Sequence, residues 1–304
     1  MARRLIECVP NFSEGRDRTV IEAIVSAASS VAGAAVLAYE CDADHHRSVV
    51  AIAGSPDAVE EAAFRAVAEA VRRIDLNQHA GVHPRIGAAD VVPFVPVEGV
   101  AMEDCVAIAH RFGERVWRDL RVPVYFYEQA ARHPDRRRLE NVRRGRFEGL
   151  RDEVRRNTDR RPDIGEPELH PTAGAVAIGA RKYLLAFNIN LATADVSIAD
   201  RIARRIRQSS GGLPHVKAMG VLLESRGLAQ VSMNLTDFEV TPLHAVFEAV
   251  RREAAALGVE IAGSEIIGLM PAAALAMSAA HFLQCENYSV NALLERRIAA
   301  KVID

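Results

Sequence analysis

The strongest constraint on the fold of this chain is an order of apolar segments that occurs twice. In the first half, period-two and helical patterns predict a strand, a helix, two strands, a helix and a further strand. Pro56 stands at the first position of the second helix, where its missing N–H is tolerated. We expect the strands at 5–9, 34–39, 48–53 and 90–95 and the helices at 18–31 and 56–73, followed by a helix over 101–119 and a strand over 122–127.

The second half returns to this βαββαβ order, which is that of a ferredoxin-like unit. We therefore predict an α+β protein with two ferredoxin-like subdomains packed around an interlobe ligand cleft. The later strands are expected at 184–190, 216–223, 229–234 and 259–262 and the helices at 195–208, 242–257, 271–283 and 289–303.

Composition narrows the class of protein further. The 304 residues fit two domains, and the hydrophobic fraction of 49% is enough for two cores. The formal net charge of -2 points to neither a nucleic-acid nor a membrane-surface partner. No apolar stretch is long enough to span a membrane, and the first apolar run is too short for a signal peptide, so we expect a cytoplasmic protein. The four cysteines are too scattered for a zinc or redox motif.

Two polar loops stand out as candidates for chemistry. The segment His79-Ala-Gly-Val-His-Pro-Arg-Ile-Gly-Ala-Ala-Asp90 lies between a helix and a strand. Its two histidines have the i,i+4 spacing of a zinc site, but Gly81 and Pro84 disfavour a helix and no third ligand is near. A catalytic histidine and an ordinary hydrogen-bonding histidine remain open. The second loop, Glu40-Cys-Asp-Ala-Asp-His-His-Arg47, is either a polar turn or the acidic half of one site with the first loop.

Two further segments have two interpretations each. The Gly/Pro-rich segment 165–174 lies where the two lobes should join, and it is either a ligand-binding segment or an interlobe linker. Residues 132–161 hold twelve arginines against six acids, which indicates either an anion or nucleic-acid patch or a pair of solvated helices. Acids are interspersed and aromatic residues are scarce, so the second interpretation is favoured.

Longer motifs give the chain a specific resemblance. The segments Glu7-Cys-Val-Pro-Asn-Phe-Ser-Glu-Gly15, Gly81-Val-His-Pro-Arg-Ile-Gly-Ala-Ala-Asp90 and Asn234-Leu-Thr-Asp-Phe-Glu-Val-Thr-Pro-Leu-His244 resemble those of the glutamate formimidoyltransferase family. Further matches are Pro93-Phe-Val-Pro96, 179–190 and 263–271, so the resemblance runs in order from residue 7 to about 275. In animals this domain forms the N-terminal part of formimidoyltransferase-cyclodeaminase.

The resemblance implies an activity and an assembly. It implies subdomains of residues 1–183 and 184–304, a homodimer, and transfer of a formimidoyl group between N-formimidoyl-L-glutamate and N5 of tetrahydrofolate, with no metal. Tetrahydrofolate would be the co-substrate, and a separate cyclodeaminase would act downstream. Rival interpretations are a glutamate formyltransferase using 5-formyltetrahydrofolate, a non-catalytic folate-binding protein and an RNA-binding module.

The resemblance also assigns residues. His83 would be the catalytic histidine, and an acid that relays protons to it falls on Glu40, or on Asp42 if the register shifts slightly. Relatives usually read Asn-Arg where this chain reads His46-Arg47. Cations suited to the substrate carboxylates are Arg47, Arg85, Arg181 and Lys182, although each is equally suited to a local ion pair. The folate-contacting segment would comprise Gly165, Glu166, Pro167, Glu168, Leu169, His170, Pro171, Thr172, Ala173 and Gly174.

Overall fold

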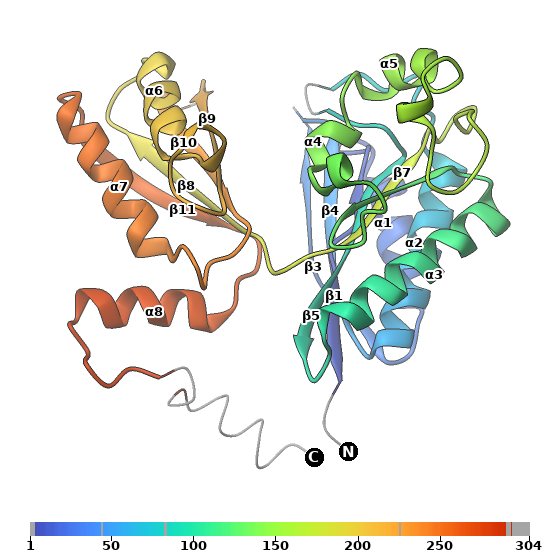
Figure 1. Ribbon diagram of the computed structural model, residues 1–304, viewed down its shortest axis with the longest axis horizontal. Coiled ribbons are helices and arrows are strands. Elements are labelled where there is room, and N and C mark those ends of the chain that lie inside the picture. The colour runs from blue at the N-terminus through green and yellow to red at the C-terminus, as the bar shows by residue number, and fades with distance from the viewer. Residues whose placement is uncertain (1–3, 44, 82–83, 225, 290–292, 294–304) are drawn as a thin grey trace. The chain divides into compact units, whose positions relative to one another are not determined.

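The computed structural model describes residues 4–43, 45–81, 84–224, 226–289 and 293 (Figure 1). The chain forms two compact units, which divide between Arg181 and Lys182. The boundary predicted from the sequence lies two residues further along the chain. The α+β class and the presence of two domains are confirmed.

The first unit contains a mixed sheet of seven strands in the described part of the chain. The strands β3, β4, β1–β2 and β5 lie side by side in this order and pair antiparallel, with β1 and β2 forming one interrupted strand. β7 then pairs in parallel with β5, and β6 pairs in parallel with β7. The elements are β1 (Leu5–Cys8), β2 (Asn11–Phe12), α1 (Arg18–Ser29), β3 (Ala34–Asp42), β4 (Arg47–Gly54), α2 (Pro56–Arg73), β5 (Ala89–Glu98), α3 (Met102–Leu120), β6 (Val124–Glu128), η1 (Pro134–Arg137), α4 (Leu139–Val142), α5 (Arg146–Glu153), η2 (Thr158–Arg160) and β7 (Val176–Ala180).

Helices α1, α2 and α3 cover one face of this sheet (Figure 1). The buried side of α2 is mostly alanine and valine, and these small side chains let the helix pack closely against the strands. Ile6 and Cys8 of β1 point into the same core, whereas Glu7 between them faces the other side of the sheet because strand side chains alternate. Polar groups on that second face therefore stand on a rigid support.

The second unit contains a four-stranded antiparallel sheet in the order β11, β8, β10, β9. Its helices α6 and α7 pack on one face through Ile202, Ile206, Val246 and Val250. The elements are β8 (Leu185–Leu191), α6 (Val196–Ile206), η3 (Gln208–Ser210), β9 (Val216–Leu223), β10 (Leu228–Leu235), α7 (Leu243–Ala256), β11 (Ile261–Ile267) and α8 (Ala272–Phe282).

Two sequence predictions of structure need correction. The last strand of the second unit is Ile261–Ile267 rather than 259–262, because its apolar residues alternate further along the chain than the short run suggested. The arginine-rich segment forms short helical pieces, η1, α4, α5 and η2, rather than two longer solvated helices. The helix predicted over 289–303 lies almost entirely outside the described residues.

No helix in the described ranges has the length and apolar character needed to cross a membrane.

Candidate active site

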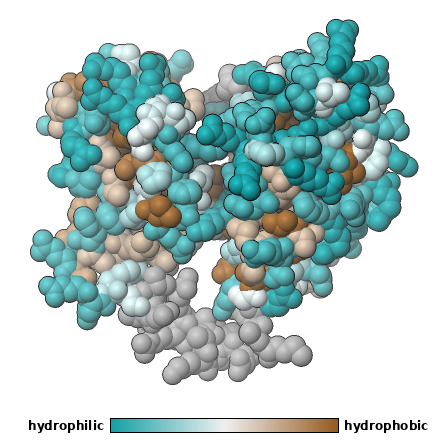
Figure 2. Space-filling view, in the orientation of Figure 1, coloured by the Kyte–Doolittle hydropathy of each residue, from teal (hydrophilic) through white to brown (hydrophobic). Residues whose placement is uncertain are grey.

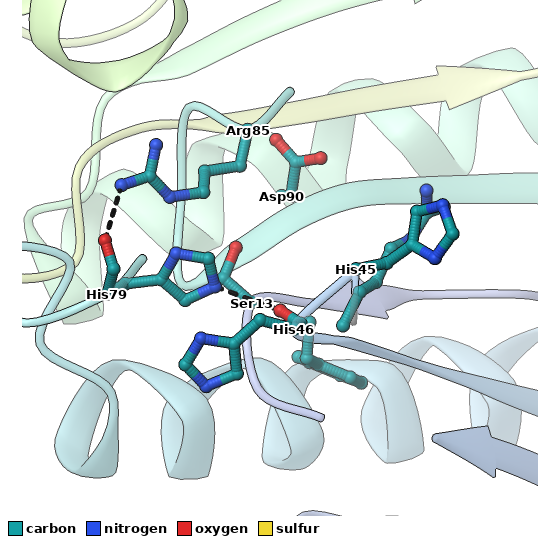
Figure 3. Close-up of a pocket in the computed structure, with 8 residues that line it drawn as sticks. Ser13, His45, His46, His79, Arg85 and Asp90 are labelled. Atoms are coloured by element: carbon teal, nitrogen blue, oxygen red, sulfur yellow. Dashed lines mark hydrogen bonds between the residues drawn. The ribbon is translucent and has the colours of Figure 1, made fainter. Parts of the chain in front are cut away.

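The two polar loops of the first unit meet, as their composition suggested. The imidazole of His46, from the loop between β3 and β4, stacks on that of His79, with ring centroids 4.1 Å apart and ring planes 7° from parallel (Figure 3). Gly81 lies against the same loop, where a methyl group would come within 2.7 Å of the His45 carbonyl oxygen and 2.8 Å of the His46 Cβ. Only glycine permits this approach, so Gly81 helps to bring the loops together.

Reciprocal hydrogen bonds join the stacked residues. His79 Nε2 lies 2.9 Å from the backbone carbonyl oxygen of His46, and His46 Nδ1 lies 3.2 Å from that of Ala80. Carbonyl oxygens only accept, so both ring nitrogens donate. Burial lowers the pKa of His79, and the positive charges of Arg85 and His46 lower it further against the opposing hydrogen bond and Glu14. His79 is therefore neutral near pH 7, with its proton on Nε2.

Glu14 completes this cluster from the segment between β2 and α1. Its Oε1 lies 3.0 Å from His46 Nε2 and accepts the backbone N–H groups of Arg16 and Asp17 at 2.8 and 3.0 Å. Burial acts to raise the pKa of Glu14, but the hydrogen bonds from Asp17 and Arg16 and the contact with His46 outweigh it and leave the pKa below its usual value. The carboxyl is therefore ionised at neutral pH.

His83, the predicted catalytic histidine, lies outside the described residues, but the loop is anchored on both sides of it. Arg85 is buried, and its Nη2 donates to the His79 carbonyl at 3.0 Å (Figure 3). The same nitrogen donates to Glu148 at 2.9 Å. Further on, the Ile86 N–H donates to the Asp90 carboxylate at 2.8 Å. Residues 79–81 and 85–90 are therefore fixed.

A buried ion pair lies beneath this loop. Asp90, at the start of β5, pairs with Arg143, which comes from the arginine-rich segment, and both side chains are largely shielded from solvent. Arg47 lies near them at the start of β4. Burial lowers the pKa of Arg47 to about 10, and the charge of Arg143 adds to this against Asp90 and Asp42. Arg47 therefore stays charged at neutral pH.

The arginine-rich segment has an internal role that neither interpretation of the sequence anticipated. Arg136 pairs with Asp163 at 2.7 Å, and Arg160 donates to the carbonyl oxygens of Asn141, Val142 and Arg144. These arginines are buried because long connecting loops bring backbone carbonyls inside, where each needs a donor. The exposed members lie around α4 and α5, where the surface is strongly hydrophilic (Figure 2).

The predicted folate segment belongs to the first unit, so the linker interpretation is wrong. Its second half is bonded to the histidine loop and the residues before it: Leu76 N donates to Thr172 O at 2.9 Å, and Ala88 N donates to Ala173 O at 2.9 Å. His170 Nδ1 accepts the N–H of Ala173 at 3.0 Å, which closes the segment into a tight turn. The first half, residues 165–168, is exposed, and the chain then enters β7 in the interior of the sheet.

The two candidate acids occupy different settings. Glu40 is exposed on the edge strand β3, opposite Val49. Asp42 lies at the end of β3 and contacts His45, whose backbone N–H and Nδ1 lie 2.8 and 2.7 Å from its carboxylate. Asp42 also lies close enough to Arg47 to influence its pKa. Of the two acids, Asp42 is the one that the described contacts link to the charged cluster.

The remaining cations lie apart from each other. Arg181 directly follows β7, hydrogen bonds to the phenol of Tyr127 and carries the charge opposite Glu7. Lys182 belongs to the second unit, where its Nζ lies 2.6 Å from Asp237 and 3.4 Å from Glu239.

Glu7 is a functional candidate that sequence reasoning missed. It is only 4% exposed, and its Oε2 has no hydrogen-bond partner among the described residues. Burial raises its pKa to about 7, although Arg181 opposes the shift. The alternation of β1 was the available signal, because a carboxylate between two apolar residues of a central strand must face a polar surface or remain desolvated. Glu14 was missed because it lies outside both polar loops.

Within the described ranges, no group of three histidine, cysteine or acidic side chains is arranged to hold a metal ion.

The chain matches two family models in sequence. Residues 5–181 match the N-terminal subdomain of the formiminotransferase domain, and residues 186–304 match the formiminotransferase domain. A glutamate formimidoyltransferase of Streptococcus pyogenes serotype M1 is 45% identical, with 94% of this chain and 95% of the relative covered. That of Thermoplasma acidophilum is 42% identical, with 97% of each chain covered. The formimidoyltransferase-cyclodeaminase of Mus musculus is 44% identical, and the match covers 94% of this chain and 54% of the relative.

The fold and the paired polar loops are those of an α+β enzyme domain with a preorganised imidazole cluster. The two models together span nearly the whole chain, and the chain belongs to the formiminotransferase family. This confirms the resemblance seen in the motifs.

Proposed function

We propose that this chain is a glutamate formimidoyltransferase that moves the formimidoyl group between N-formimidoyl-L-glutamate and N5 of tetrahydrofolate. The observation that carries the proposal is the match, over nearly the full length of both proteins, to two glutamate formimidoyltransferases at 42% and 45% identity. The anchored histidine loop supports it, because group transfer between two nitrogens needs a proton carrier in a fixed position.

His83 is proposed as that proton carrier. N5 of tetrahydrofolate attacks the formimidoyl carbon and forms a new N–C bond and a tetrahedral intermediate. His83 accepts the N5 proton and delivers it to the glutamate nitrogen, whose bond to the same carbon then breaks. One imidazole suits both steps because its ordinary pKa is near 6.5. Alignment of the two substrates supplies much of the remaining acceleration, an effect of up to about 7–11 kcal/mol.

The contacts of the four cations separate their proposed roles. Arg85 is already engaged by Glu148 and the His79 carbonyl, and Lys182 is engaged by Asp237, so we assign both to structure. Arg47 and Arg181 remain candidates for the substrate carboxylates, since both lie among the polar groups on the sheet of the first unit. Asp42 is favoured over Glu40 as the acid that supports the proton carrier, because of its link to Arg47.

Gly165–Gly174 is proposed as a folate-contacting segment. Its first half is exposed and carries Glu166, and its second half is bonded to the histidine loop. Folate on this segment would therefore lie near the proposed proton carrier. Hydrogen exchange with a folate analogue should show protection over 165–174.

The ferredoxin-like assignment of both units is also a proposal. It is supported by the βαββαβ order and by strand orders equivalent to 4-1-3-2 in each sheet. A homodimer, which the resemblance implies, and a cytoplasmic location, which the sequence pattern predicts, remain predictions.

One assay tests the activity and its nearest alternative together. The purified protein is given N-formimidoyl-L-glutamate with tetrahydrofolate in one arm and glutamate with 5-formyltetrahydrofolate in the other. We expect turnover that is faster in the first arm, followed as 5-formimidoyltetrahydrofolate and glutamate. Faster turnover in the second arm would assign a glutamate formyltransferase, and saturable folate binding without turnover in either arm would leave a folate-binding protein.

A further inference from the structure

The hydrogen-bonding pattern around His46 requires a particular protonation state. Nδ1 faces the Ala80 carbonyl oxygen at 3.2 Å, and Nε2 faces the Glu14 carboxylate at 3.0 Å. Both partners are acceptors, whereas a neutral imidazole carries only one N–H. The two hydrogen bonds exist together only when His46 is an imidazolium.

The surroundings favour a positive charge at this position. The side chains of His46 and Glu14 are only 12% and 15% exposed, so their attraction is weakly screened by solvent. His79, stacked on His46, is the neutral partner, since burial and the charge of Arg85 lower its pKa. A cation above a neutral ring is tolerated, whereas two stacked cations would repel each other.

Other charged groups line the same small cavity. They are His45 and Arg47 from the hairpin of His46, Arg85 from the histidine loop and Asp90 from β5. Arg85 is paired with Glu148, Asp90 with Arg143 and His45 with Asp42. Of the acids around the cluster, Glu14 is the one for which a contact with His46 is observed.

The bonded atoms show what the charge accomplishes. Ala80 and His79 are the third and fourth residues before His83. We propose that His46, held as an imidazolium between Glu14 and the Ala80 carbonyl, is a positioning residue that fixes the segment leading into His83. This inference rests on the proposed function only for the role of His83. The bridge joins three separate segments: the connection between β2 and α1, the β3–β4 hairpin and the histidine loop.

Loss of the proton would break the bridge at one end. Neutral His46 keeps only one of its two donors, so either the Ala80 carbonyl or Glu14 Oε1 loses its hydrogen bond to the ring. The loop would then sample more positions, and misplacement by about 1 Å can cost about 100-fold in rate. The proposal therefore predicts a fall in kcat/KM on the alkaline side that follows deprotonation of His46.

Three variants and a control test the bridge. His46→Asn keeps an amide donor toward Ala80 and suits the positive φ of 50° at this position, but it cannot titrate. Its kcat/KM should stay within about 10-fold of wild type and lose the alkaline limb, whereas His46→Ala should lose about 100-fold. Glu14→Gln removes the opposite charge and should move the limb to lower pH. The control is His215→Asn, the same substitution at a positive φ of 58° in the second unit, which should keep the wild-type profile.

A second measurement does not depend on turnover. In the free protein, ¹⁵N chemical shifts of the imidazoles, assigned with His46→Asn, should show both His46 nitrogens protonated at about pH 6 and a single proton on His79. A His46 ring with one proton at that pH, or a wild-type alkaline limb in His46→Asn, would overturn the proposal. If wild type showed no transferase activity, the proposed function would fail, while the ¹⁵N spectra would still decide whether the bridge exists.

Discussion

Each unit of the molecule holds a stacked pair of histidines, and the two pairs differ in what surrounds them. His46 and His79 stack at 4.1 Å in the first unit, and His244 and His281 stack at 4.0 Å in the second. The first pair is bonded to carbonyl oxygens and to Glu14. One buried ring nitrogen of each pair, His79 Nδ1 and His244 Nδ1, has no partner among the described residues, and burial, followed by the charge of His281, lowers the pKa of His244. The two pairs therefore share their ring geometry. The hydrogen bonds to carbonyl oxygens and to Glu14 are what distinguish the first pair, the candidate site, from ordinary packing.

The sheet-borne carboxylates of the two units differ in the same way. Glu265 of β11 accepts hydrogen bonds from Asn190, Arg226 and Gln230, and these lower its pKa, the bond from Asn190 most of all. Glu7 of β1 is buried with one oxygen unpartnered, and its pKa rises to about 7. Glu265 thus has its hydrogen bonds supplied within the second unit, whereas Glu7 of the first unit keeps one carboxylate oxygen without a partner among the described residues. Four experiments probe this contrast.

The largest effect is expected from Arg143→Ala, which removes the ion pair beneath the first site. Arg143 is 12% exposed, and its loss leaves the buried Asp90 carboxylate without its ion-pair partner, so the free energy of unfolding should fall by about 3–5 kcal/mol. The matched control is Lys182→Ala in the second unit, where the lysine is 52% exposed and the loss should be about 1 kcal/mol or less. Urea denaturation of both variants measures these free energies. Equal losses would show that the Arg143 and Lys182 ion pairs contribute equally to stability.

His83→Ala should fold normally and lose about two orders of magnitude or more in kcat, the scale of general acid–base catalysis. His79→Ala should have a milder effect, since His79 supports the loop through its hydrogen bond to the His46 carbonyl. Steady-state kinetics of both variants checks the assignment. Near-normal turnover of His83→Ala combined with an inactive His79→Ala would place the proton carrier at the stack itself.

Glu7→Gln should change how stability depends on pH. The folded-state pKa of Glu7 is raised, so the stability from this group is fully present below about pH 4.5 and is lost as the pH rises through about 7. The variant cannot ionise here, and at pH 8 it should be more stable than wild type by about 2–3 kcal/mol. The difference should vanish near pH 4.5. Denaturation curves at both pH values test this. A difference in stability that did not change with pH would show that burial does not raise the pKa of Glu7.

The smallest effect is expected from His281→Ala in the second unit. His281 stacks on His244 but offers it no hydrogen bond in the described contacts. Stability should change by about 0.5 kcal/mol or less, and the pH profile of kcat/KM should match wild type. A shifted profile would show that the second pair also contributes to the reaction.

Local patterns predicted much of this molecule because the information lies in neighbouring residues. The alternation of strands and the helical period gave the element order of both units, and the clustering of histidine and glycine marked the loops that meet. The partnerships of Glu14 with His46 and of Asp90 with Arg143 were missed, because they join residues 32 and 53 positions apart in the chain. The burial of Arg136 and Arg160 was missed for a similar reason, since it depends on carbonyl oxygens that only the folded loops bring inside.

The crossing of the histidine loop and the segment 165–174 has a consequence for protein engineering. A methyl group at Gly87 would lie 1.8 Å from the Ala175 carbonyl oxygen, and one at Gly174 would lie 2.2 Å from the Ile86 carbonyl oxygen. The two backbones thus pack so closely that the shape of each depends on the other, and a segment with a different backbone would not fit against either. A loop graft intended to change substrate choice should therefore transplant both segments at once, because one exchanged alone would meet a surface shaped for its original neighbour.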